Sequence, residues 1–136
     1  MRLLLFAFLF CCSSPVKAQM VLADSIDLSQ TTKEKVKPKV YYGIASYYAD
    51  KFEGRQTANG EIYAHSKLTA ACNILPLGTW IRVTNLRNNK SVIVKTNDRL
   101  HIRMKRIVDL SKSAAKTLGY TGRGLTQVMV EVIRKK

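Results

Sequence analysis

The sequence predicts a small, mainly β domain that folds as a closed barrel with one short helix. Three features support this: several short segments rich in β-branched and aromatic residues, a single helix with clear end signals, and long connections that contain glycine. The chain has 136 residues, of which 46% are hydrophobic and 24% charged. This composition excludes a disordered basic tail, and the length allows one ordinary domain.

Five segments are predicted to be strands, and one to be a helix. The predicted strands are, in chain order, Val40–Tyr48, Thr79–Leu86, Ser91–Lys95, Arg106–Leu110 and Gln127–Ile133. The second and third form a hairpin through the turn at 87–90, because apolar and polar residues alternate on both sides of it. Ser111 is predicted to cap a helix that ends at Leu118, with Gly119 as its left-handed terminator. Residues 50–60 contain turn-forming residues and are predicted to be a long loop.

Residues 1–18 are predicted to be a cleaved secretory signal. Arg2 supplies a positive charge, Leu3–Cys12 is an apolar run, and small residues follow at the cleavage position. The run is too short to span a bilayer, which takes about 20 apolar residues, and no second apolar run follows it in the sequence. Residues 19–39 are polar and lysine-rich and are predicted to be a flexible basic leader. The barrel domain then covers residues 40–136.

Charge and cysteine content narrow the class further. The chain carries 23 Lys and Arg against 9 Asp and Glu, a net charge of +14. Loss of residues 1–18 removes two cations and no acid, which leaves +12. It also removes Cys11 and Cys12 and leaves Cys72 as the sole thiol, so an internally disulfide-bonded scaffold is excluded. Lipidation at Cys11 or Cys12 is an alternative to simple cleavage, because residues 9–12 resemble a lipoprotein processing box.

Few acidic residues fall within the predicted domain, and their positions differ. Asp109 directly precedes the helix, where a carboxylate favours the positive end of the helix dipole. Asp50 and Glu53 lie in a loop, where we expect them to be solvated. Glu61 follows a turn and Asp98 follows a strand, positions at which chains commonly place reactive groups.

Asp98 and Glu61 are therefore candidate catalytic acids. A carboxylic acid can protonate a glycosidic oxygen when an apolar site raises its pKa, and a second acid nearby raises that pKa further. Aromatic side chains suited to packing on sugar faces flank the segment around Glu61. They are Tyr47, Tyr48, Phe52 and Tyr63. The alternative for Asp98 is a structural turn, since Asp commonly accepts backbone N–H bonds.

Seven segments of the domain form an ordered set of motifs. They are Gly43–Tyr48, Phe52–Tyr63, Leu68–Ala71, Leu75–Thr79, Val83–Leu86, Asn97–Arg99 and Arg106–Ser111. In order and spacing, from about Tyr42 to Ile133, this set closely resembles the rare lipoprotein A family. The resemblance implies a six-stranded double-psi β-barrel of the expansin type. It also implies a bacterial envelope protein that acts on peptidoglycan as an endolytic lytic transglycosylase.

The implied reaction cleaves the MurNAc–GlcNAc β-1,4 bond without water. One acid protonates the leaving oxygen, and the C6 hydroxyl of the muramic acid attacks the anomeric carbon to give a 1,6-anhydro product. A single acid/base suffices, in contrast to the two carboxylates of ordinary glycosidases. Carried over by position, Asp98 resembles the acid/base and Glu61 the supporting acid. The candidate substrate-binding residues are Tyr47, Tyr48, Thr57, Asn59, Tyr63, Cys72, Asn97, Arg99 and His101.

Two positions depart from the family pattern. Family members usually carry a His directly after Leu-Thr-Ala-Ala, where this chain has Cys72. A neutral thiol replaces an imidazole poorly and is commonly a buried apolar filler, so weakened or altered catalysis is expected; a reactive thiolate is the alternative. Leu100 and His101 stand where Gly and Pro usually follow the Asn-Asp-Arg motif. His101 either fills part of the missing imidazole's role or is an ordinary exposed loop histidine, as we expect for His65.

Three functions stay open at this point. They are a peptidoglycan lytic transglycosylase, a non-catalytic expansin-like module that binds or loosens the wall, and a basic envelope-interaction protein.

Cations bracket the site loop and predict attraction to an anionic wall polymer; they are Arg99, Arg103, Lys105 and Arg106. Predicted export and the lack of a nucleic-acid motif argue against nucleic acid as the partner. No metal or other cofactor is expected, because metal-ligand spacing is absent from the sequence. We expect a monomer in the periplasm or cell envelope.

Overall fold

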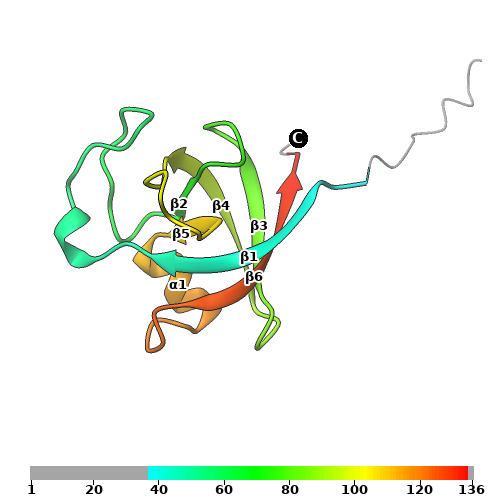
Figure 1. Cartoon of the computed structure of the whole chain (residues 1–136). Helices are drawn as coiled ribbons and strands as arrows, with labels where there is room; N and C mark the ends of the chain where they lie inside the picture. The colour runs from blue at the N-terminus through cyan, green and yellow to red at the C-terminus, as the bar shows by residue number, and fades with distance from the viewer. Residues whose placement is uncertain (1–36, 135–136) are drawn as a thin grey trace, which may run out of the picture. The chain divides into compact units, whose positions relative to one another are not determined.

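The structure, a computed structural model, describes residues 37–134 (Figure 1). The predicted signal and nearly all of the predicted leader lie outside the described residues. The elements are, in chain order, β1 (Val40–Tyr47), the 3-10 helix η1 (Asp50–Phe52), β2 (Thr69–Cys72), β3 (Trp80–Asn85), β4 (Ser91–Asp98), β5 (Val108–Leu110), α1 (Lys112–Leu118) and β6 (Thr126–Ile133). Neither described helix is long and apolar enough to cross a membrane.

The six strands close into one barrel, in the order β1-β5-β2-β4-β3-β6 (Figure 1). The pairs β1–β5 and β2–β4 are parallel, and the other neighbouring pairs are antiparallel. Closure leaves no strand edge unpaired. The predicted mainly β fold, a six-stranded barrel with one short helix, is confirmed.

Apolar side chains at alternate strand positions fill the barrel. The fully buried residues of this core include Ala45, Ile81, Val83, Val94, Val108, Leu110, Val128 and Val130. The two long strands of the predicted hairpin show the alternation clearly, since exposed and buried residues succeed one another along β3 and along the first half of β4. On α1, Ala114, Ala115 and Leu118 are buried against the same core.

Both ends of α1 lie where the sequence predicts them. The Ser111 side chain accepts a hydrogen bond from the Ala114 backbone N–H, which satisfies a donor of the first turn. Gly119 follows the helix with φ 73°, a left-handed conformation that glycine adopts without strain. Local capping chemistry therefore suffices to set this helix.

The strand β2 is absent from the prediction made on residue pattern. All four of its residues are buried, so it shows no alternation of polar and apolar side chains. The strand β4 also runs three residues beyond its predicted end, to Asp98, because its last part pairs with β2. These two differences have one cause, since the extension of β4 depends on a partner strand that the pattern did not reveal.

Asp109 does not interact with the positive end of the dipole of α1, in contrast to what the sequence predicts. It lies in β5, and its two carboxylate oxygens accept hydrogen bonds from Nε and an Nη of Arg106 at 2.8 and 3.0 Å. This two-point pairing is the strong geometry for an arginine and a carboxylate. The predicted dipole role for Asp109 is wrong, and Ser111 alone caps the helix through its side chain.

Candidate active site

One pocket brings together most of the residues that the sequence singles out. It has a volume of about 590 Å³ and lies where the ends of β1 and β4 meet the long connection from β1 to β2. The candidates in its lining are Tyr47, Tyr48, Thr57, Tyr63, Asp98, Arg99 and His101. The candidates outside its lining are Asn59, Glu61, Cys72 and Asn97.

The Asp98 carboxylate is held by three hydrogen bonds. Its Oδ1 accepts the backbone N–H groups of Ala58, at 2.9 Å, and of Arg99, at 2.8 Å. Its Oδ2 accepts the Tyr48 hydroxyl at 2.7 Å. A carboxylate oxygen has two acceptor positions, so Oδ1 is fully used, whereas Oδ2 keeps one position free.

Tyr48 is the link between Asp98 and the aromatic wall of the pocket. Its ring stacks on Tyr63, with centroids 4.3 Å apart, and meets the edge of Phe52 at 5.7 Å. Burial of the phenol, its hydrogen bond to Asp98 and the charge of that carboxylate together raise the pKa of Tyr48 far above its ordinary value. The hydroxyl therefore stays protonated and acts as a donor to Asp98.

A β-bulge presents Asp98 to the pocket. Along the β2–β4 ladder, Ala70 pairs with Thr96 while Ala71 pairs with Asp98, so Asn97 is an extra residue on β4. Bulges bend a strand and re-aim its side chains. Here the consecutive residues Asn97 and Asp98 serve different partners: Asn97 is buried and binds Glu61, whereas Asp98 lines the pocket.

Glu61 lies on the exposed side of this arrangement. Asn97 donates its side-chain N–H to Glu61 Oε2 at 3.0 Å, and the Glu61 backbone N–H donates to Asn59 Oδ1 at 3.0 Å. The hydrogen bond from Asn97, followed by one from Asn59, holds the pKa of Glu61 below its ordinary value. Thr57 completes the turn by donating its hydroxyl to Asn59 at 2.7 Å. Glu61 is thus an ionised carboxylate outside the pocket lining.

Cys72 belongs to the barrel core. Its side chain is fully buried, and burial raises the pKa of its thiol. Ala71, the preceding residue, lines the pocket, and Cys72 does not. Arg99 donates from its guanidinium to the backbone carbonyls of Cys72 and Leu75, so this predicted site cation also holds the end of β2 and the loop that follows it.

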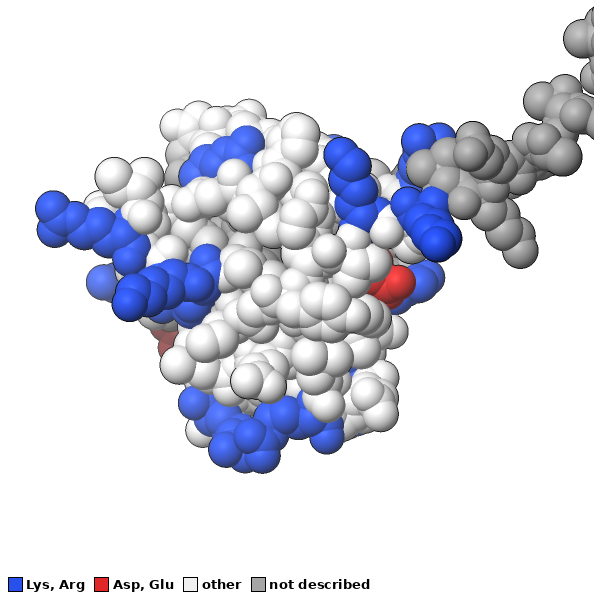
Figure 2. All heavy atoms as spheres, turned by 45° about the vertical axis from the view of Figure 1, so that its right-hand side comes forward, with Lys and Arg blue, Asp and Glu red and all other residues white. Residues whose placement is uncertain are grey.

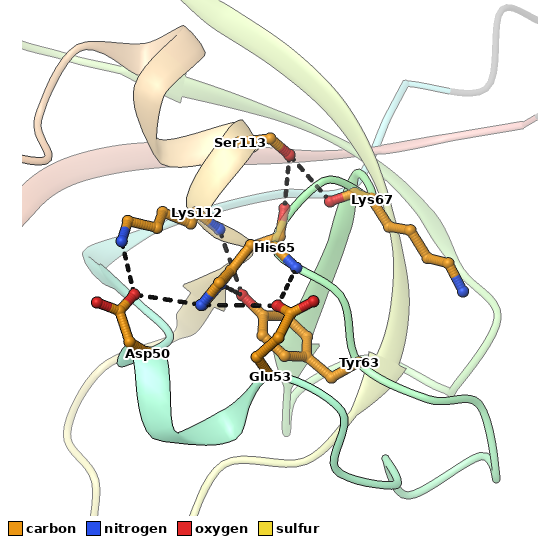
Figure 3. Close-up of polar contacts among 8 residues, drawn as sticks. Asp50, Glu53, Tyr63, His65, Lys67, Lys112 and Ser113 are labelled. Carbon is orange, nitrogen blue, oxygen red and sulfur yellow. Dashed lines mark hydrogen bonds and ion pairs between the residues drawn. The ribbon is translucent and has the colours of Figure 1, made fainter.

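A polar cluster beside the pocket was not predicted (Figure 3). His65 Nε2 lies 3.2 Å from Asp50 Oδ1 and 3.6 Å from Glu53 Oε2, and its Nδ1 shares a hydrogen bond of 2.8 Å with the Tyr63 hydroxyl. Lys112 Nζ lies 2.6 Å from the same oxygen of Asp50. Asp50 and Glu53 are exposed, as predicted, although both contact His65. The prediction that His65 is an ordinary exposed histidine is wrong, because its side chain is only 23% exposed and both ring nitrogens have contacts. The only feature of the sequence that could have indicated this cluster is the spacing of Asp50 and Glu53, which lie one turn apart.

The positive charge is spread over the surface. Figure 2 shows Lys and Arg side chains around the margin of one face, with a largely uncharged centre. Of the cations predicted to bracket the site, Arg106 is paired with Asp109. Within residues 37–134, no group of three His, Cys, Asp or Glu side chains is arranged to hold a metal ion.

Comparisons with known proteins agree with this architecture. A family model described as lytic transglycolase matches residues 41–130. The chain is 47% identical over 105 residues to the endolytic peptidoglycan transglycosylase RlpA of Haemophilus influenzae, covering 76% of this chain and 37% of that protein. It is 53% identical over 91 residues to the protein of the same name from Pseudomonas aeruginosa PAO1, covering 67% and 27%. The chain thus spans about a third of the length of these curated relatives.

Solved structures share the barrel at lower identity. A Streptomyces papain inhibitor matches with a TM-score of 0.57 and 21% identity, covering 71% of this chain and 96% of that one. An expansin of Clavibacter michiganensis matches with a TM-score of 0.55 and 22% identity, covering 72% and 52%. These likenesses concern the fold, and they confirm the predicted expansin-like barrel.

Proposed function

The chain belongs to the lytic transglycolase family, and from this premise we propose that it cleaves the MurNAc–GlcNAc β-1,4 bonds of peptidoglycan as an endolytic lytic transglycosylase. The two curated relatives described above carry that activity in their names. The observation that carries the proposal is Asp98: a carboxylate with one free acceptor position in the wall of an aromatic pocket.

In the proposed reaction, Asp98 is both the acid and the base. Because Oδ1 is occupied by two N–H donors, the proton is carried on Oδ2, beside the Tyr48 hydroxyl. Asp98 gives this proton to the glycosidic oxygen as the bond to the anomeric carbon breaks. The C6 hydroxyl of the same MurNAc then bonds to that carbon and returns its proton to Asp98, so that no water is consumed and the acid is regenerated.

The aromatic wall supports the same proposal. Tyr48 and Phe52 lie in the pocket lining with Tyr47, and their rings offer apolar faces to a sugar. Glu61, ionised and outside the lining, is proposed to act through Asn97 and Asn59 by holding the turn that carries the Ala58 N–H. It is thus a positioning residue rather than a proton donor.

Incubation of purified sacculi with the protein, followed by mass spectrometry of the released material, tests the proposal. We expect 1,6-anhydro muropeptides from the wild type and none from Asp98→Asn. The new amide oxygen retains both backbone hydrogen bonds, and the Tyr48 hydroxyl can turn to accept the new N–H, so we expect this variant to fold. Anhydro products released equally by Asp98→Asn would refute the assignment of the acid.

Cys72 favours one alternative, a non-catalytic expansin-like module that binds peptidoglycan. The thiol is buried outside the pocket lining, and within residues 37–134 His101 is the only histidine in that lining. Under this alternative the wild type sediments with sacculi and releases no anhydro product. Under the third function, a basic envelope-interaction protein, it shows neither activity.

We further propose that residues 1–18 direct export and that the protein acts as a monomer in the periplasm or cell envelope. The apolar run at Leu3–Cys12 and the small residues after it support export. N-terminal sequencing of the protein from fractionated cells tests the predicted cut after Ala18. A mature chain that begins at Cys11 or Cys12 and carries lipid would favour the lipid-anchored alternative.

A further inference from the structure

The segment 50–55 presents opposite charges to two sides. Its acids, Asp50 and Glu53, are absent from the pocket lining and point to the His65 cluster (Figure 3). Its cations, Lys51 and Arg55, both line the pocket. The segment therefore separates its own charges, with the negative ones bound on one side and the positive ones facing the cavity.

The bonds of the acidic side explain this separation. Asp50 binds Lys112 Nζ at 2.6 Å and lies 3.2 Å from His65 Nε2. Glu53 Oε2 accepts the His65 backbone N–H at 2.6 Å. These contacts tie the segment to His65 and to the start of α1, and they give its two carboxylates partners other than Lys51 and Arg55.

Lys51 and Arg55 share the Phe52 ring. Lys51 Nζ and Arg55 Cζ each lie 5.4 Å from the centre of that ring. No carboxylate of residues 37–134 forms an ion pair with either cation. A cation over an aromatic face is held in place while its charge stays available to a ligand.

The other arginines of the pocket are already engaged. Arg106 is paired with Asp109, and Arg99 donates to the carbonyls of Cys72 and Leu75. Arg99 has no carboxylate partner either, but its guanidinium is held at these two carbonyls. Lys51 and Arg55 are the lining cations that lie next to an aromatic ring, on the side of the pocket formed by the segment 50–55.

We propose that Lys51 and Arg55, together with the Phe52 ring, form a subsite for a carboxylate of the glycan substrate. This inference rests on the proposed function for the identity of the polymer. Peptidoglycan offers carboxylates from two sources: the lactyl group of MurNAc where the stem peptide is missing, and the stem peptides where they are present. The subsite binds this anionic group while the sugar chain passes Asp98.

Binding measurements in an Asp98→Asn background test the subsite without digesting the ligand. Four ligands are used, each attached to beads: fragments of intact sacculi, glycan strands stripped of stem peptides by an amidase, and a sample of each in which the carboxylates are converted to amides. The variant is Lys51→Ala/Arg55→Ala. Its control is Arg87→Ala/Lys90→Ala, which removes the same charge from the turn between β3 and β4, where neither residue lines this pocket. Dissociation constants come from sedimentation at a fixed salt concentration, since salt screens such contacts.

We expect the pocket variant to bind at least one carboxylate-bearing ligand about tenfold more weakly than the control variant does, and to bind the amidated ligands as the control does. A loss on intact sacculi assigns the subsite to stem peptides, and a loss on stripped glycan assigns it to the lactyl group. An equal loss on amidated ligands, or the same loss in the control variant, overturns the subsite. Because the readout is binding, its failure is distinct from the failure of the proposed cleavage, which is read from anhydro products.

Discussion

Asp98 and Glu61 carry the same functional group in two different surroundings. Asp98 lines an aromatic pocket and takes its hydrogen bonds from two backbone N–H groups and a tyrosine. Glu61 is exposed, lies outside the pocket lining and is bound by the Asn97 amide, which lowers its pKa. Of the two, only Asp98 lines the pocket, so it alone is placed to exchange a proton with a ligand bound there.

The two regions are separated by a single step along β4. Asn97 and Asp98 are neighbours in the chain, yet the bulge at Asn97 gives them partners in different regions. Adjacent strand residues face opposite sides by default, and the bulge adds a local bend to that alternation. Proximity in sequence to a reactive group is thus a poor guide to sharing its site.

The largest expected effect is on the reactivity of the Cys72 thiol, because the adjacent residues Ala71 and Cys72 of β2 also have different surroundings. Cys72 is buried in the core while its neighbour Ala71 lines the pocket, and burial raises the thiol pKa. In protein lacking residues 1–18, we expect Cys72 to react with a disulfide reagent at pH 8 at least about 10³-fold more slowly than in the urea-unfolded chain, because reaction requires opening of the core. Cys72→Ser supplies the blank. Rapid labelling of the folded protein would place the thiol at the pocket.

A second, smaller effect concerns the donor to Asp98. Tyr48→Phe keeps the ring that stacks on Tyr63 and removes the hydroxyl bonded to Oδ2. A hydrogen bond to a charged group is worth about 1.5–3 kcal/mol, so anhydro-product formation is expected to fall about 10- to 100-fold. Tyr42→Phe, at an exposed position on β1, is the matched control. Equal rates for the two variants would mean that the Tyr48 hydroxyl does not contribute to the reaction.

A third test concerns the polar cluster around His65, which holds the Tyr63 ring on which Tyr48 stacks. His65→Ala removes the hydrogen bond to the Tyr63 hydroxyl and the contacts with Asp50 and Glu53. We expect a loss of about 1–2 kcal/mol in local stability, seen as faster hydrogen exchange of amides in residues 50–65 and unchanged exchange in β3 and β6. His101→Ala is the control, because His101 is exposed. Uniform acceleration across the barrel would mean that the cluster supports the whole fold.

The smallest expected effect is the pH dependence due to Glu61. Its folded-state pKa lies below the ordinary 4.5, so its contribution to stability is present above that pH and is lost as the pH falls through the folded-state value. For an exposed group the contribution is under about 1 kcal/mol. Urea midpoints of wild type and Glu61→Gln should therefore differ slightly at pH 6 and converge near pH 2. A gap that widens on acidification would contradict this sign.

Local chemistry made part of this structure predictable from sequence. The caps of α1 rest on Ser111 and Gly119, residues whose effect extends over one turn. Asp98 was singled out because it follows a strand and stands in the Asn97–Arg99 motif. In each case the information lies within a few residues of the feature it predicts.

Contacts between distant residues account for what was missed. The strand β2 is buried on every side, so no alternation marks it. The partners of His65 are brought together from η1 and α1, and the link from Glu61 to Asn97 spans 36 positions. Such contacts join residues that lie far apart in the chain, so residue spacing does not reveal them, apart from the spacing of Asp50 and Glu53.

The most direct measurement compares two variants in one sacculus digestion: the initial rate of 1,6-anhydro product formation by Asp98→Asn and by Glu61→Gln. General acid catalysis contributes about 10²- to 10⁴-fold to such reactions, so we expect Asp98→Asn to lose at least about 10²-fold and Glu61→Gln to lose less than about tenfold. The reverse ranking, or equal losses in the two variants, would contradict the assignment of Asp98 as the single proton donor.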